Sequence, residues 1–131
     1  MARRDTNVLV RYLAQDDPAQ SARATRLIER ELGERDPGYI SLVVLVEVCW
    51  VLKRLYSATV AELHETVRDL LDARQLVVER RATVSAALAS LGDGSGDFAD
   101  ALIGECARAA GCQRTVTFNK AAVRLGMVLL R

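Results

Sequence analysis

The stretch that decides the fold class is YISLVVLVEVCWVLKRL, which occupies residues 39–55. Tyr39 and Ile40 predict a brief strand, and Ser41 is a favourable N-cap for a helix over residues 42–55. Short apolar strands that alternate with helices are typical of parallel α/β folds. Because the rest of the chain repeats this alternation, we expect a small, mostly parallel sheet flanked by helices.

The other elements follow from caps, turn residues and apolar periodicity. Asn7 is a plausible N-cap for a first helix, and Pro18 is typical of a helix start. The sequence predicts helices over residues 8–13, 18–32, 59–72, 83–91, 98–110 and 120–125, and strands over 76–78, 115–117 and 127–130. No repeat or linker interrupts the 131 residues, so we expect a single domain over residues 1–131.

The composition excludes few classes of protein, but it limits the kinds of binding partner that we expect. Only 5% of the residues are aromatic, which argues against a stacking surface for single-stranded nucleic acid. The net charge of +1 identifies no partner. All basic residues except Lys53 and Lys120 are arginines, whose forked guanidinium suits the phosphates of RNA. A GC-rich genome would explain the same preference.

The three cysteines and the single histidine exclude a zinc centre. Cys49, Cys106 and Cys112 form no C-x-x-C pair, and only His64 could join them, whereas structural zinc sites use four closely spaced ligands. Cys49 and Cys106 lie in apolar stretches, so we interpret them as small buried side chains. A reducing cytoplasm is the expected compartment. The first residues do not resemble a signal peptide, and the longest apolar run is too short to span a bilayer.

Two common types of catalytic site are also absent from the sequence. His64 lies in a predicted helix among polar residues, so we expect it at the surface and find no Ser/His/Asp set. The glycines of residues 92–96 lack the Lys-Ser/Thr ending of a phosphate-binding loop.

Glu47 is the most informative acidic residue. Its neighbours one helical turn away are all apolar, which predicts that its side chain faces the protein interior; they are Val43, Val44, Trp50 and Val51. A buried carboxylate costs several kcal/mol unless it is paired or bound to a metal. Both explanations remain open: Glu47 is a metal ligand, or it forms a structural salt bridge with an arginine.

Further polar side chains fall where parallel sheets bind ligands. Asp97 and Asp100 stand three residues apart at a helix start, which puts both carboxylates on one face. Capping by Asp97 and the helix dipole at Asp100 would also explain this pair. Gly104, one turn further, would leave room beside Asp100. Asp5 follows a short first strand expected at the start of the chain, and Asn119 follows the strand predicted over residues 115–117. An Asp after a strand is often only a turn former.

Acidic residues from distant parts of the sequence suggest metal chemistry if the fold brings them together. Like charges repel unless something neutralises them. Carboxylate oxygens are ligands that suit Mg²⁺ or Mn²⁺, and such ions activate water and stabilise the charge on phosphate oxygens. We therefore hypothesise a metal site formed by Asp5, Glu47, Asp97, Asp100 and Asn119.

At these residues the chain resembles a known family. The four stretches are DTNVLVRYL at residues 5–13, ISLVVLVE at 40–47, DFADALI at 97–103 and TVTFNK at 115–120. In this order they resemble the four acidic motifs of PIN-domain proteins, with Asn119 where the family usually has Asp. Chain length and the third motif favour the VapC branch, whose members are toxins of bacterial toxin–antitoxin pairs.

The resemblance implies an α/β/α sandwich, metal-dependent cleavage of RNA with Mg²⁺ or Mn²⁺, a homodimer, and inhibition by a VapB-type antitoxin. Asp5, Glu47 and Asp100 match the catalytic metal ligands, and Asp97 matches a frequent additional acid. Asn119 keeps an oxygen donor but lacks the charge, so a second metal should bind more weakly. Polar positions around the same pocket match Thr6, Asn7, Ser41 and Thr117.

Two alternatives follow from the same residues. Asn119 suggests a PIN fold with a weakened site that binds an antitoxin or RNA without cutting it. A phospho-acceptor receiver domain also gathers acids at the carboxyl edge of a parallel sheet. It requires an acidic pair after the first strand, and residues 5–7 supply only Asp5.

Overall fold

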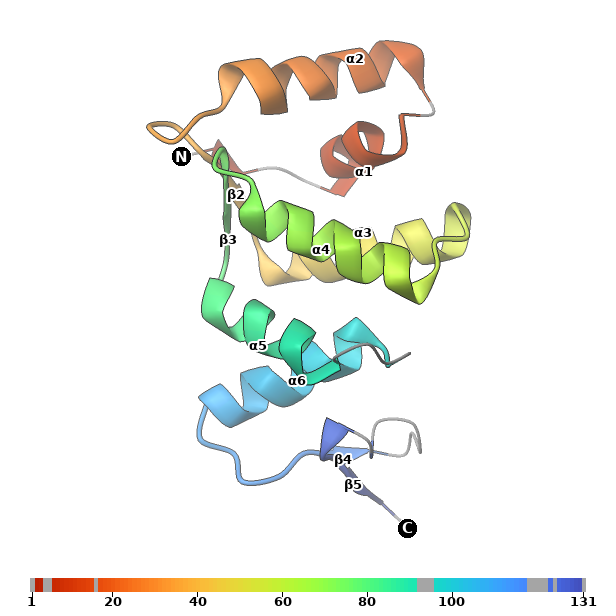
Figure 1. Cartoon of the computed structure of the whole chain (residues 1–131), viewed down its shortest axis with the longest axis vertical. Helices are drawn as coiled ribbons and strands as arrows, with labels where there is room; N and C mark the ends of the chain where they lie inside the picture. Colours follow the sequence, from red (N-terminus) through yellow and green to blue (C-terminus); the bar gives the residue numbers. More distant parts are fainter. Residues whose placement is uncertain are drawn as a thin grey trace. The chain divides into compact units, whose positions relative to one another are not determined.

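The computed structural model describes residues 2–3, 6–15, 17–91, 96–117, 123 and 125–130. The chain divides into two compact units, Met1–Glu79 and Arg80–Arg131. Figure 1 shows the elements of both units along the chain. All strand pairs described are parallel, which confirms the expected mixed α/β class with small parallel sheets.

The first unit contains a three-stranded parallel sheet in the order β1-β2-β3. The strands are β1 (Ala2–Arg3), β2 (Gly38–Ile40) and β3 (Leu76–Val78). Gly38 is in register with both Ala2 and Leu76. Parallel pairing requires a crossover between successive strands, and the helices of this unit supply these crossovers. Their bounds are α1 (Thr6–Ala14), α2 (Pro18–Arg26), α3 (Leu42–Leu55) and α4 (Val60–Asp72).

The core of the first unit lies between these helices and the sheet. In Figure 1, α2 lies along α1, and α3 lies beside α4; both pairs are in contact. The fully buried side chains come from α1, the helical turn that directly follows α2, β2, α3 and α4. They are Leu9, Ile28, Ile40, Leu45, Val48 and Val67. After Arg26 the α2 helix continues as a π-helical turn, η1 (Leu27–Glu31), so the helix predicted from residue 18 to 32 is confirmed with a wider last turn.

Side-chain caps fix several helix starts. Asp17 caps α2 by accepting a hydrogen bond from the Gln20 backbone N–H at 3.1 Å. Thr59 and Glu62 form a reciprocal capping box at the start of α4. The prediction of Asn7 as an N-cap is wrong, because α1 already begins at Thr6 and Asn7 lies inside its first turn.

The second unit consists of two packed helices and a two-stranded parallel sheet. Helix α5 (Arg81–Leu91) contacts α6 (Phe98–Ala109), and β4 (Val116–Thr117) pairs with β5 (Val128–Leu129). Helix α6 ends before Gly111, whose φ of +93° is a left-handed conformation that glycine adopts without strain. Asn119 and most of the helix predicted over residues 120–125 lie outside the described residues.

The burial of His64 and of one cysteine differs from what the sequence predicts. His64 is buried on the apolar face of α4, so its predicted surface position is wrong. Cys49 is buried as expected, whereas Cys106 is only half-buried. Among the described residues, no helix has the length and apolar character needed to cross a membrane.

Candidate functional site

Glu47 lies in the first half of α3, and its side chain is exposed. The prediction that it faces the interior is therefore wrong. The core-facing side of α3 is formed by Leu45, Val48, Cys49 and Leu52. The physical reason is that α3 is apolar almost all round, so the apolar neighbours of Glu47 do not mark the buried face.

The surroundings of Glu47 are exposed but still apolar. Val43 and Trp50, one turn before and one turn after it, are 74% and 57% exposed. Arg54 stacks over the Trp50 ring at 5.4 Å from its centroid. Within the described part of the chain, no basic side chain lies within salt-bridge distance of Glu47. The salt-bridge explanation for this residue therefore has no support there.

The carboxyl end of the three-stranded sheet carries an acid that the sequence analysis missed. Glu79 directly follows β3, and its backbone N–H donates to the Ile40 carbonyl at 2.8 Å. Its carboxylate accepts a hydrogen bond at 2.8 Å from the backbone N–H of Leu42, at the start of α3. Ser41 caps the same helix, because its Oγ accepts from the Val44 N–H at 3.2 Å. An acid directly after an apolar strand was the available signal, as it was for Asp5.

The Glu79 carboxylate also affects the pKa of Tyr39. Burial raises the pKa of its phenol above 10.0, and the negative charge of Glu79 and a hydrogen bond to that carboxylate raise it further. The phenol therefore stays protonated and donates to Glu79. The end of β2 and the start of α3 are thus joined to Glu79 by three hydrogen bonds, which fixes the position of Ser41.

Asp97 and Asp100 lie together at the start of α6. Asp97 is the N-cap, with Oδ1 accepting from the Ala99 N–H at 2.8 Å, so the capping interpretation is confirmed. Asp100 is half-buried in the first turn, where the positive end of the helix dipole favours a carboxylate. The two acids share one helix turn, as their spacing predicted. The open space expected beside Gly104 is instead taken by Met127, whose Cε would lie 3.4 Å from an added Cβ.

The remaining predicted site residues are spread over both units. Thr6 and Asn7 belong to the first turn of α1, and Thr117 ends β4. Asp5 and Asn119 lie outside the described residues. Among the residues that the structure describes, no three His, Cys, Asp or Glu side chains cluster tightly enough to hold a metal ion. The oxygen donors of the predicted set nevertheless have the chemistry that Mg²⁺ and Mn²⁺ require.

Comparison with known proteins assigns the family. The model of the PIN domain matches residues 4–126, which is nearly the whole chain. The chain therefore belongs to the PIN-domain family, an α/β/α fold whose members are generally nucleases that use divalent metals. None of the curated proteins compared with the chain matches it.

Proposed function

We propose that this chain is a metal-dependent endoribonuclease of the VapC toxin type. Family membership supports a nuclease. The length of the chain and the DFADALI stretch at residues 97–103 favour the toxin branch. The observation that carries the proposal is the state of Glu47, an exposed carboxylate without a salt-bridge partner in the described chain. It caps no helix and pairs with no described cation, so the fold does not require it. A role in binding a metal explains why an acid interrupts this apolar helix.

The proposed roles follow the motifs. Asp5, Glu47 and Asp100 hold a divalent ion, Mg²⁺ or Mn²⁺, and Asp97 and Asn119 assist. When bound, this ion supplies an activated water and stabilises charge on the phosphate that is cut. The carboxylates keep that region negatively charged in the absence of the ion, so metal binding and RNA binding are expected to be coupled. The proposal assigns four further polar residues to the surroundings of this ion, namely Thr6, Asn7, Ser41 and Thr117.

The test is cleavage of purified RNA by the pure protein with Mg²⁺ or Mn²⁺, compared with EDTA and with Asp5→Ala. Discrete products that disappear under both conditions are the expected result. Cleavage that survives Asp5→Ala would show that this assignment of the metal ligands is wrong. Circular dichroism of the variant checks that it remains folded.

The cellular part of the proposal is a toxin that pairs with a VapB-type antitoxin and acts as a homodimer. The three free cysteines suit a reducing cytoplasm. Induced expression in bacteria should arrest growth with the unaltered chain and not with Asp5→Ala. Light scattering measures the oligomeric state, and a monomer at micromolar concentration would contradict the dimer.

Asn119 favours a second candidate function, a PIN domain that binds antitoxin or RNA with a weakened active site. An amide in place of a carboxylate keeps an oxygen ligand but removes one negative charge from the metal site. Under this alternative, Asn119→Asp raises metal-dependent cleavage sharply. If the unaltered chain already cuts RNA and Asn119→Asp changes nothing, the alternative fails.

A further inference from the structure

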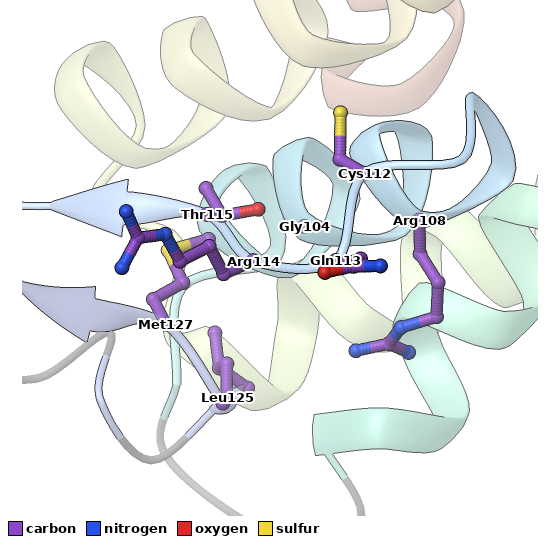
Figure 2. A pocket seen from close by; sticks show the side chains of 9 residues that line it. Gly104, Arg108, Cys112, Gln113, Arg114, Thr115, Leu125 and Met127 are labelled. Carbon is purple, nitrogen blue, oxygen red and sulfur yellow. The ribbon is translucent and has the colours of Figure 1, made fainter.

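The second unit contains a small pocket near the C-terminal half of α6, away from its acidic start. It encloses about 40 Å³ between α6, the loop that leads to β4, and the residues just before β5. Figure 2 shows Gly104 on α6 and Met127 before β5 at this pocket, with Arg108, Gln113, Arg114 and Thr115 around it. This space accommodates about three water molecules or one small tetrahedral anion, and it is too small for a nucleoside.

The lining of the pocket is rich in hydrogen-bond donors. Arg108, Gln113 and Arg114 all line it, and in the view of Figure 2 the Gln113 amide lies between the two guanidinium groups. In the part of the chain that the structure describes, Arg114 forms no ion pair. There the backbone N–H groups of Gln113 and Arg114 also donate no hydrogen bond. Two cationic side chains and free backbone donors are the groups that bind phosphate oxygens.

Two features oppose an anion and limit its affinity. Arg108 is engaged by Glu105, with 2.6 Å between Nη1 and Oε1. The C-terminal end of α6 carries partial negative charge, which repels anions within the last turn. One positive charge therefore remains after Glu105 is counted, and the dipole reduces its effect. A single weak phosphate contact is the result to expect, rather than tight binding of a free anion.

We infer that this pocket binds one phosphodiester group of an RNA strand as a second anchoring point, separate from the acidic end of α6. This inference rests on the proposed ribonuclease function. Asp100 and Arg108 are eight residues apart on one helix, so the rise of 1.5 Å per residue separates them by about 12 Å. An RNA strand whose cut phosphate lies near Asp100 would place another phosphate, further along the strand than the adjacent one, near the pocket.

RNA fits the pocket better than a free nucleotide does, because the lining residues that the structure describes supply phosphate contacts and no aromatic ring for a base. Among them there is no Trp, Tyr or Phe, whereas sites that read bases stack them on such rings. The contact is therefore independent of sequence. The contact would hold the strand in place while the acids act on a phosphate elsewhere in the same strand.

The test measures binding of a fluorescein-labelled single-stranded RNA by anisotropy in EDTA, where cleavage does not interfere. Arg114→Ala is expected to weaken binding about 3- to 10-fold and to flatten the slope of log K against log salt by about 0.7, the value for one phosphate contact on a single strand. The matched control is Arg74→Ala, which removes the same charge from an exposed ion pair with Glu34. It should change binding less than twofold.

A third variant tests whether more positive charge at the pocket tightens RNA binding. Glu105→Gln frees Arg108 from its ion pair and should tighten RNA binding about two- to threefold, a gain that a damaged structure would not produce. Titration with inorganic phosphate should shift the amide NMR signals of Gln113 and Arg114 only at millimolar concentration. Phosphate shifts without an effect of Arg114→Ala on RNA would indicate a site for a free anion and overturn the RNA assignment.

The outcomes separate this inference from the proposed function. If RNA is cut but Arg114→Ala and Arg74→Ala bind it equally well, the pocket assignment fails and the nuclease stands. If RNA is not cut but Arg114→Ala still weakens binding, the anchoring point stands and the nuclease fails. Absence of RNA binding by the unaltered protein overturns the anchoring point directly.

Discussion

Glu79→Ala tests the carboxyl edge of the three-stranded sheet. The substitution removes the acceptor at 2.8 Å from the Leu42 N–H and leaves that donor at the start of α3 without a partner. A hydrogen bond to a charged group contributes about 1.5–3 kcal/mol, and a carboxylate at a helix N-terminus about 0.3–1 kcal/mol. Because Glu79 is only half-buried, we expect a loss of about 2 kcal/mol in the free energy of unfolding. With a urea slope of about 2 kcal/mol per M, the midpoint falls by about 1 M.

Two variants control this experiment. Glu79→Gln keeps an acceptor without the charge and should lose about half as much stability. Glu34→Ala removes an exposed carboxylate from a 3.7 Å ion pair and should cost less than about 0.5 kcal/mol. A urea midpoint for Glu79→Ala that matches that of Glu34→Ala would refute the role of Glu79 at the start of α3.

The titration of Tyr39 gives an independent check on the same carboxylate. Its phenol pKa lies above 10.0 in the folded protein, and Glu79→Gln should bring it closer to 10.0 because the negative charge disappears. The raised pKa means that the folded state holds its proton more tightly than the unfolded state. Stability should therefore fall as pH rises above 10.0. Absorbance of tyrosinate at high pH, with Tyr39→Phe as reference, measures this pKa.

Ser21, Gly111 and Glu62 each give a further prediction about stability. Ser21→Ala on α2 should raise stability by about 0.5–1 kcal/mol in urea unfolding, because the buried Ser21 Oγ has no hydrogen-bond partner in the described chain. Gly111→Ala should lower it by about 1–2 kcal/mol in the same assay, since φ is +93°. The pKa of Glu62 lies below 4.5 because the Thr59 N–H and hydroxyl bond its carboxylate. The stability that it contributes is present above pH 4.5 and is lost as pH falls through the lower pKa of the folded state, which NMR titration of Glu62 can follow.

The elements with strong end signals could be predicted from the sequence. Helix α3 begins after Ser41 and ends at Leu55 as predicted, because a capping side chain marks its start. Strand β3 also has the predicted bounds of Leu76 and Val78. The start of α1 was misplaced, because the threonine and asparagine before its apolar residues are acceptable both as caps and inside a first turn.

Which face a residue occupies was harder to predict. His64 was assigned to the surface from its polar neighbours, yet it lies one turn from Val67 on the buried stripe of α4, together with Leu63 and Leu71. Periodicity was the better guide there, since residues three and four apart share a helix face. On α3 periodicity failed, because an apolar residue occurs at nearly every position and no contrast marks the core side.

In the candidate site, features local to one helix could be predicted from the sequence, whereas contacts between distant residues could not. The shared turn of Asp97 and Asp100 is a local property of one helix, so their spacing was sufficient to predict it. Glu79 acts through the start of α3, which lies 37 residues earlier in the chain. Only strand pairing brings those residues together, and the sequence contains no local signal of that contact. The single-domain prediction and the convergence of the acids on one metal remain predictions.

Glu47 and Asp97 offer the clearest separation of function from folding. Glu47 caps no helix and has no described salt bridge, so Glu47→Gln should change the free energy of unfolding by less than about 0.5 kcal/mol. Asp97 caps α6, so Asp97→Ala should cost about 1 kcal/mol, whereas Asp97→Asn keeps the cap.

If both acids serve a metal, Glu47→Gln and Asp97→Asn should leave stability nearly intact and still reduce cleavage of RNA. The loss should be larger for Glu47→Gln, which removes a core ligand, than for Asp97→Asn, which removes an assisting one. Cleavage by Glu47→Gln at the rate of the unaltered chain would mean that this exposed acid belongs to no metal site. The same result would leave the nuclease in place but remove Glu47 from the proposed metal ligands, and the acid among the apolar residues of α3 would then have no explanation.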